Sequence, residues 1–137
     1  MIPLAVYGTL RQGERNADLV GGARLLGTAR IAGRLHRMAA TTDRAYPYPA
    51  LMPATDDGDE VVVEILDLVD AEALRTIDAL EAFDPADPEG SEYVRSEVDV
   101  RNGPVPTAWV YLYNGPQEAV GDRIVDGDWV GRDRALD

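Results

Sequence analysis

The sequence predicts an α+β domain with one helix and a mostly antiparallel β-sheet that is curved or partly closed. Three observations support this prediction. Several short strand-like segments are separated by turn signals, one segment has helical periodicity, and the regular strand–helix alternation of a doubly wound sheet is missing. The length of 137 residues suits one domain, so we expect a single domain over residues 1–137.

Strand-like segments dominate the first half of the chain. Residues 3–7 form an apolar run that ends at Gly8, which is typical of a buried strand. Residues 25–38 are expected to be extended, with bends at Gly27 and Gly33, because two glycines inside one helix would each cost about 1 kcal/mol. Between these segments, Asn16 is expected to cap a brief helix over residues 17–20.

The middle of the chain combines a loop, a strand and the clearest helix. Residues 41–53 form a loop rich in Pro and Tyr that ends in a short extended piece, and residues 60–66 are the clearest strand. Asp70 is a typical helix cap, so a helix is expected from there to about Phe83.

The last part of the chain predicts a hairpin and a tail. Residues 92–100 and 106–113 alternate as strands do, and Asn102-Gly103 between them is a strong hairpin signal. The tail is polar, and Ile124 and Trp129 are its expected anchors in the core.

The composition excludes several classes of function. The formal charge of −12 would repel phosphate backbones and anionic bilayers, so we expect neither a nucleic-acid partner nor a membrane partner. Cys and Lys are both absent and His36 is the only histidine, which excludes thiolate, Schiff-base and His-rich metal chemistry. We therefore expect no metal and no cofactor, and chemistry that depends on carboxylates, hydroxyls, Arg or the backbone.

Hydropathy places the protein in the cytoplasm by default. No apolar run approaches the roughly 18 residues that span a bilayer. The first residues lack a basic segment and lead into a polar loop, which does not resemble a signal peptide.

Glu81 is a carboxylate on the apolar side of the predicted helix. On a helical wheel it falls between Leu74 and Ile77, inside the stripe that should be buried. Loss of hydration and the negative end of the helix dipole would both raise the pKa of this carboxyl toward the range of a general acid/base. Two alternatives remain open on these grounds: Glu81 pairs with an arginine such as Arg95, or it turns to water at the helix end.

A glycine follows the first predicted strand directly. Without a Cβ at Gly8, the backbone can approach a ligand closely, and successive N–H groups can bind an anion. The segment is neither a dinucleotide-binding nor a Walker loop, and taken alone a glycine after a strand is more often a tight turn with no ligand.

Taken together in their order, the motifs resemble the gamma-glutamylcyclotransferase-like family, in particular its small branch with the gamma-glutamylamine cyclotransferases. They are VYGTLRQGERN, AYPYPAL, IDALEAFD, EYVRSEVDV, TAWVYLY and GDW, and they extend from about Val6 to Trp129. The resemblance implies a small β-barrel with flanking helices, and release of 5-oxoproline from a small gamma-glutamyl compound.

The resemblance also implies site residues. It puts the substrate-holding loop on Tyr7, Gly8, Thr9 and Leu10, and the catalytic glutamate on Glu81. The chain departs from the family pattern where Ala82 replaces the usual glycine after the glutamate, which would alter the helix exit at Glu81.

Other residues are given structural roles or are left open. His36 is expected to be structural or solvated, and so are the acidic clusters at residues 56–59 and 84–89, which lack metal-ligand spacing. Alternation puts Tyr111 and Tyr113 on one strand face, where packing competes with a place in the pocket, and we assign Tyr113 to substrate binding. Tyr46 and Tyr48 are either a lid or part of a rigid turn.

Three functions remain in competition. The leading one is a gamma-glutamyl cyclotransferase with Glu81 as general acid/base, without a cofactor. A second is a binding or regulatory module of the same fold without chemistry. A third is an amide hydrolase in which Glu81 activates water, and its product would be glutamate instead of 5-oxoproline.

Overall fold

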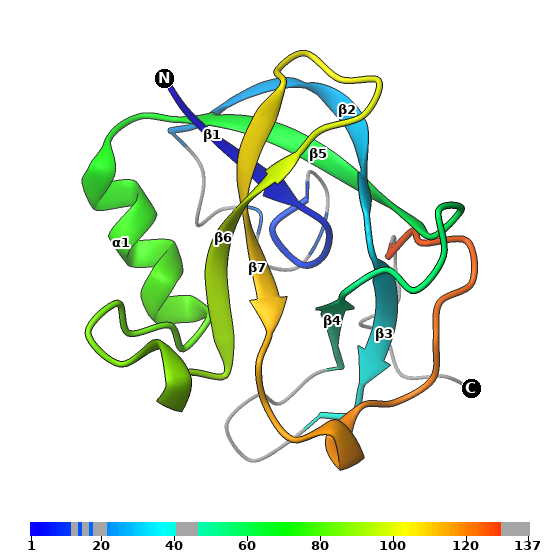
Figure 1. Ribbon diagram of the computed structural model, residues 1–137. Coiled ribbons are helices and arrows are strands. Elements are labelled where there is room, and N and C mark those ends of the chain that lie inside the picture. Colours follow the sequence, from blue (N-terminus) through cyan, green and yellow to red (C-terminus); the bar gives the residue numbers. More distant parts are fainter. Residues whose placement is uncertain (12–13, 15–16, 18–21, 41–46, 130–137) are drawn as a thin grey trace.

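The fold centres on a five-stranded sheet, which Figure 1 shows curling across the molecule. The computed structural model describes residues 1–11, 14, 17, 22–40 and 47–129. The sheet has the order β2-β5-β1-β7-β6, and β3 and β4 form a separate two-stranded sheet. The strands are β1 (Ile2–Val6), β2 (Arg24–Ala32), β3 (Arg34–Met38), β4 (Tyr48–Met52), β5 (Glu60–Leu68), β6 (Tyr93–Asp99) and β7 (Thr107–Tyr113).

The first strand lies in the middle of the sheet because it is apolar on both faces. β1 pairs antiparallel with β5 and parallel with β7. Leu4, Ala5 and Val6 are all buried, so successive side chains enter the two opposite cores. The chain leaves this central position at Tyr7, which places the following loop against the interior of the fold.

The outer strands approach each other without closing a barrel within the described residues. β2 and β6 are the ends of the strand order, but Arg30 of β2 and Arg101, just after β6, exchange backbone hydrogen bonds of 3.0 and 2.7 Å. The sheet is therefore curled and partly closed. The α+β class with a mostly antiparallel sheet is confirmed, and the barrel of the sequence-based prediction describes its curvature only loosely.

The second sheet extends the curled one around a bend. Gly33 separates β2 from β3 at φ +157°, and a Cβ there would overlap the side chain of Leu51. The predicted bends at Gly27 and Gly33 are thus confirmed, the former as a register irregularity in the pairing of β2 with β5. The segment around Arg123 lies along β3, where His36 Nδ1 is 2.9 Å from the Gly121 carbonyl oxygen and Ile124 N donates to Leu35 O at 2.7 Å.

Two apolar cores lie on the two faces of the sheet. One contains Ile77 from the helix α1 (Ala71–Leu80), with Leu4 and Val6. The other contains both predicted tail anchors, Ile124 and Trp129, and the Trp129 side chain is fully buried. Figure 1 shows α1 beside the sheet, on the side of β6.

The helix and the hairpin begin as predicted, with two differences. Asp70 caps α1 by accepting a hydrogen bond from Ala73 N at 2.9 Å. However, the helix ends at Leu80 instead of Phe83, because Glu81 is already its C-cap residue. β6 and β7 form the predicted hairpin, with Asn102 at φ 55°, but the connection is longer than a two-residue turn.

Some predicted features lie outside the described residues. The brief helix expected over residues 17–20 falls mostly there, as does Tyr46. The 3₁₀ helices described by the structure in the second half of the chain are η2 (Pro88–Gly90) and η3 (Gln117–Ala119). No helix among the described residues is long and apolar enough to cross a membrane.

The acidic turn before β5 is a compact hydrogen-bonded unit. The Asp59 carboxylate accepts bonds from Thr55 N at 2.9 Å, Thr55 Oγ1 at 3.1 Å and Asp56 N at 3.1 Å. Arg123 Nη2 donates to its other oxygen at 2.9 Å. These hydrogen-bond donors lower the pKa of Asp59 to about 2, and the backbone N–H of Thr55 makes the largest contribution.

We expect Asp59→Asn to remove part of the acid dependence of stability. The folded-state pKa of about 2 lies below the unfolded value of about 3.9, so the carboxylate stabilises the fold above about pH 4. That contribution is lost as the pH falls from 4 toward 2. Urea unfolding at pH 6, 4, 3 and 2 should give a difference between wild type and variant that shrinks over this interval. The matched control is Asp57→Asn, in the same turn, and an identical pH profile for both variants would contradict the assignment.

Candidate active site

The loop after β1 is a tight turn packed against β4. Arg11 N donates to Gly8 O at 3.0 Å and closes the turn. A Cβ on Gly8 would overlap the Pro49 ring, so only glycine permits this approach of the two segments. The missing Cβ therefore makes room for Pro49, and the glycine brings the loop and the Tyr48-Pro49 segment together as two walls of one site.

A buried arginine anchors the same loop from behind. Arg11 Nε donates to Glu64 Oε2 at 3.2 Å, and Nη1 donates to Asp128 Oδ1 at 2.5 Å. The Arg11 side chain is only 8% exposed, so both carboxylates compensate a charge that has lost its hydration. The sequence analysis missed this anchor, because neither carboxylate is near Arg11 in the chain.

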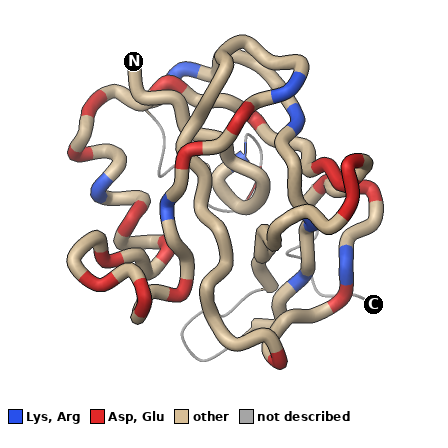
Figure 2. The backbone as a smooth tube through the Cα atoms, viewed as in Figure 1, with Lys and Arg blue, Asp and Glu red and all other residues tan. Residues whose placement is uncertain are grey.

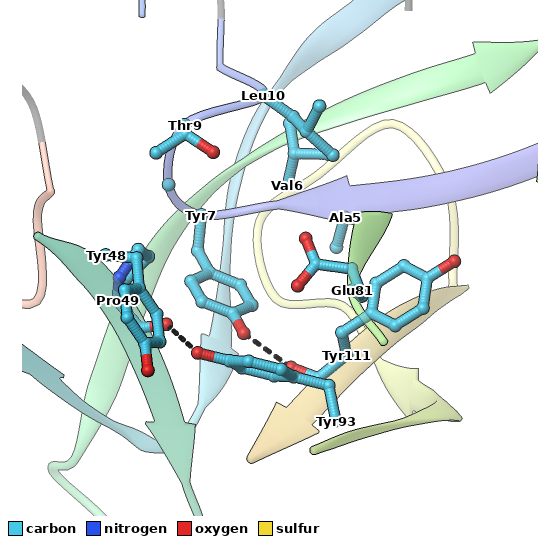
Figure 3. A pocket seen from close by; sticks show the side chains of 11 residues that line it. Ala5, Val6, Tyr7, Thr9, Leu10, Tyr48, Pro49, Glu81, Tyr93 and Tyr111 are labelled. Atoms are coloured by element: carbon cyan, nitrogen blue, oxygen red, sulfur yellow. Dashed lines mark hydrogen bonds between the residues drawn. The ribbon is translucent and has the colours of Figure 1, made fainter. Parts of the chain in front are cut away.

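A narrow cavity opens between the loop and the end of α1. It holds about 390 Å³ of empty space, including the solvent at its mouth. Figure 3 shows the carboxylate of Glu81 between the loop and the tyrosines of β6 and β7. The lining residues are Ala5, Val6, Tyr7, Gly8, Thr9, Leu10, Tyr48, Pro49, Glu81, Tyr93 and Tyr111.

Two tyrosine hydroxyls hold the walls of the cavity together. Tyr7 OH donates to the Tyr111 carbonyl at 2.6 Å, and Tyr93 OH donates to the Pro49 carbonyl at 2.5 Å (Figure 3). These bonds join the end of β1 to β7 and β6 to β4. The rings are thereby fixed as rigid walls, and their hydroxyl protons are engaged with the backbone.

An ion pair between the buried Asp78 and the half-buried Arg95 fixes the end of α1 to the sheet. Arg95 Nε and Nη2 donate to the two oxygens of Asp78 at 2.9 and 3.2 Å. The Arg95 guanidinium also lies over the rings of Phe83 and Trp109, 5.6 and 4.8 Å from their centroids. The arginine considered for Glu81 thus pairs with Asp78, one turn earlier on the same helix.

Tyr111 joins this ion pair to the cavity. Its hydroxyl donates to Asp78 Oδ1 at 2.5 Å. Burial, followed by the hydrogen bond and the negative charge of Asp78, raises the pKa of Tyr111 far above its ordinary value, and Glu81 adds to the shift. Tyr111 therefore stays protonated and acts as a fixed donor to Asp78.

The way in which α1 ends fixes the backbone position of its C-cap residue, Glu81. Phe83 N bonds to Asp78 O at 2.9 Å and Ala82 N to Ala79 O at 3.2 Å, which is a Schellman ending. Ala82 has φ 54°, a conformation that favours glycine and costs another residue about 1 kcal/mol or more. The helix therefore has a left-handed exit at an alanine.

The cavity brings together most of the residues that the sequence singled out. Tyr7, Gly8, Thr9, Leu10 and Glu81 all line it, and Glu81 is half-buried. Tyr113 lines a neighbouring cavity instead, while Tyr111, two residues earlier on the same strand face, lines this one. The roles assigned to these residues stay predictions.

The sequence analysis did not foresee two of the walls. Pro49 and Tyr93 enter the cavity from strands that are distant in the chain. Tyr48, expected as either a lid or part of a rigid turn, also lines the cavity. A signal for Tyr93 existed in its register opposite Tyr113, but register alone does not show which face meets a pocket. Among the described residues, no group of three or more His, Asp or Glu side chains could hold a metal ion.

The comparison with family models identifies the class of protein that this fold and cavity define. The model of the family described as "Gamma-glutamyl cyclotransferase, AIG2-like" matches residues 4–131. The chain therefore belongs to the gamma-glutamyl cyclotransferase, AIG2-like family. No curated protein matches the chain.

Solved structures show the same fold. An uncharacterized protein from Pyrococcus horikoshii is 26% identical with a TM-score of 0.66, and the match covers 94% of this chain and 90% of that one. An AIG2-like protein from Mus musculus is 23% identical with a TM-score of 0.63, covering 87% and 82%. A uropathogenic E. coli-specific protein is 22% identical with a TM-score of 0.61, covering 93% and 91%.

We expect Gly8→Ala to destabilise the fold and to open the cavity. The added methyl would overlap the Pro49 ring, and such overpacking typically costs about 1–3 kcal/mol. Chemical denaturation should show this loss in the free energy of unfolding. The matched control is Gly22→Ala, where the new Cβ would lie 3.8 Å from Val69 Cβ. If the two variants were equally stable, the packing of Pro49 on this loop would not require a glycine at position 8.

We expect Asp78→Asn to lower the free energy of unfolding by about 3 kcal/mol, because Arg95 loses its buried counter-charge. Glu72→Gln, on the exposed side of the same helix, should stay near wild type. Thermal and urea unfolding of both variants measure the difference. A variant at position 78 as stable as wild type would mean that this ion pair does not hold α1 in place.

Proposed function

We propose that this protein is a gamma-glutamyl cyclotransferase that releases 5-oxoproline from a gamma-glutamyl amine or amino-acid conjugate. The observation that carries the proposal is the position of Glu81. Its carboxylate lines the same narrow cavity as the Tyr7–Leu10 loop, in a chain that belongs to the gamma-glutamyl cyclotransferase, AIG2-like family. The site residues and the substrate are part of the proposal.

The chemistry needs only a base, a folded substrate and donors for a developing oxyanion. Glu81 takes a proton from the substrate's neutral α-amino group as that nitrogen attacks the γ-carbonyl carbon of the same molecule. A five-membered ring closes as the bond to the leaving nitrogen breaks, and protonated Glu81 returns its proton to that nitrogen. The atoms balance without a nucleophilic side chain or a co-reactant.

The surroundings of Glu81 suit such a role. The carboxylate is half-buried beside the rings of Tyr7, Tyr93 and Tyr111, so the proton transfer would occur with little competing water. Backbone N–H groups of the loop at Gly8–Leu10 would steady the substrate carboxylate or the oxyanion. The Tyr111 hydroxyl donates to Asp78, so its proton is not directed at the Glu81 carboxylate.

A hydrolase would use the same carboxylate to activate water, and a binding module would use the same cavity without chemistry. The tight packing of the loop against Pro49 favours ring closure, because a narrow cavity holds the substrate's two ends together. The products distinguish the alternatives: 5-oxoproline indicates a cyclotransferase, and glutamate indicates a hydrolase.

We expect Glu81→Gln to lower kcat for 5-oxoproline release by about 10²–10⁴-fold, which is the usual contribution of a general acid/base. The assay incubates purified protein with a panel of gamma-glutamyl amines and amino acids and measures 5-oxoproline and glutamate. Glu72→Gln is the matched control, and melting temperatures show that both variants fold.

Three outcomes would contradict the proposal in different ways. Full activity of the Glu81 variant would remove Glu81 from the chemistry. Release of glutamate would indicate a hydrolase. If no compound gave a product while one raised the melting temperature, the protein would be a binding module of the same fold.

A further inference from the structure

The ion pair between Asp78 and Arg95 lies beside the proposed base without being part of the cavity. Asp78 and Glu81 are three residues apart at the end of α1, so they are neighbours on the same side of the helix. Neither Asp78 nor Arg95 is among the described residues that line the cavity of Glu81. The pair would therefore affect a reaction there through its neighbours rather than by contact with the substrate.

The Arg95 side chain is committed to Asp78. Its Nε and Nη2 atoms donate to the two carboxylate oxygens at 2.9 and 3.2 Å, and no other described side chain accepts a bond from it. The Asp78 side chain is 5% exposed and the Arg95 side chain 18%, so water screens their charges only weakly. The positive charge of Arg95 is thus balanced by one carboxylate, although the sequence left open that Glu81 would be its partner.

The Tyr111 hydroxyl reports that the three charged groups lie close together. Burial is the largest cause of its raised pKa, the bond to Asp78 and the charges of Asp78 and Glu81 add to it, and the charge of Arg95 opposes it. Figure 3 shows the Tyr111 ring beside Glu81, with its hydroxyl directed away from the Glu81 carboxylate. Because Arg95 and Glu81 both act on this one hydroxyl, the charge of Arg95 is also within range of Glu81.

Other titratable groups face Glu81 from the strands packed against the end of the helix. Glu92, just before β6, accepts a hydrogen bond from Tyr48 OH at 3.0 Å. Figure 2 shows mainly acidic residues along α1 and the segment that follows it. A guanidinium released from Asp78 would therefore meet further carboxylates, and Glu81 is the next one in the chain. The tyrosines around Glu81 each donate their hydroxyl proton in a hydrogen bond and so carry no charge: Tyr7, Tyr48, Tyr93 and Tyr111.

We propose that Asp78 is a positioning residue for the base: by holding Arg95 it keeps the guanidinium charge from acting on Glu81, which stays basic enough to accept the substrate's proton. This inference rests on the proposed function. A carboxylate beside a cation is stabilised in its charged form and takes up a proton less readily. The bond from Tyr111 to the same carboxylate helps to hold Asp78 where Arg95 meets it.

Three variants change the charge beside Glu81 in different directions. Asp78→Asn leaves Arg95 uncompensated, which should move the midpoint of the Glu81 titration about 1 pH unit lower. Arg95→Met leaves Asp78 uncompensated and should move the midpoint higher. The double variant removes both charges and should bring the midpoint back close to that of wild type. A purely structural ion pair predicts no such opposite signs, because both single variants break the same contact.

The test titrates the Glu81 side-chain carboxyl by carbon NMR in the full chain. Glu81→Gln identifies the resonance, because it removes it. The matched control is Arg75→Met, which removes an exposed arginine from the same helix and should leave the titration unchanged. Release of 5-oxoproline from a panel of γ-glutamyl amides is measured on the same proteins. Asp78→Asn should lower kcat about 3- to 10-fold, as expected of a weaker base, and the double variant should recover most of this loss.

Melting temperatures show which variants fold, and the double variant keeps the test decisive. Replacing a whole buried ion pair by neutral groups is tolerated better than removing one partner. If Asp78→Asn does not fold, the midpoint must rise in Arg95→Met and return in the double variant.

The inference and the proposed function fail in different ways. An unchanged midpoint in Asp78→Asn, shifts of the same sign in both single variants, or a double variant as displaced as a single one would overturn the role of Asp78. An active wild type would still be a cyclotransferase in each of these cases. If wild type released 5-oxoproline from none of the amides, the proposed function would fail, and the role of Asp78 toward a base would fail with it whatever the titrations show.

Discussion

The ion pair between Asp78 and Arg95 is the contact on which the rest of the site depends. A buried carboxylate is costly unless its oxygens have partners, and here the Asp78 carboxylate accepts two bonds from the half-buried Arg95 and one from Tyr111. The aromatic rings of Phe83 and Trp109 cover the guanidinium. Because Asp78 lies one turn before Glu81, this cluster fixes the helix end, and with it the Glu81 backbone, against β6 and β7.

The opposite wall depends on close packing as well as on an ion pair. Because β1 is central in the sheet, the loop at Gly8 lies against the interior of the fold. Gly8 has no Cβ, so the Pro49 ring can pack directly on the backbone of this loop. The buried Arg11 anchors the same loop to Glu64 and Asp128. Two walls from distant parts of the chain thus face each other across the narrow cavity. A carboxylate lies at its edge.

The sequence predicted the strands, the hairpin and the capped helix well, because local signals such as Asp70 and Asn102-Gly103 determine them. It also singled out Glu81 and the Tyr7–Leu10 loop, which the structure places in one cavity. It could not predict that Arg95 pairs with Asp78 or that Tyr111 rather than Tyr113 enters that cavity. Those facts depend on strand register and sheet curvature, which arise from contacts between residues far apart in the chain.

The most direct test is a crystal structure of the Glu81→Gln variant with an uncleaved γ-glutamyl amine. The account predicts that the substrate's α-amino nitrogen lies within hydrogen-bonding distance, about 3 Å, of the side-chain oxygen at position 81. It also predicts that the substrate carboxylate meets the loop at Gly8–Leu10. A γ-glutamyl group bound elsewhere, or bound here with its amino group turned away from position 81, would contradict the central claim.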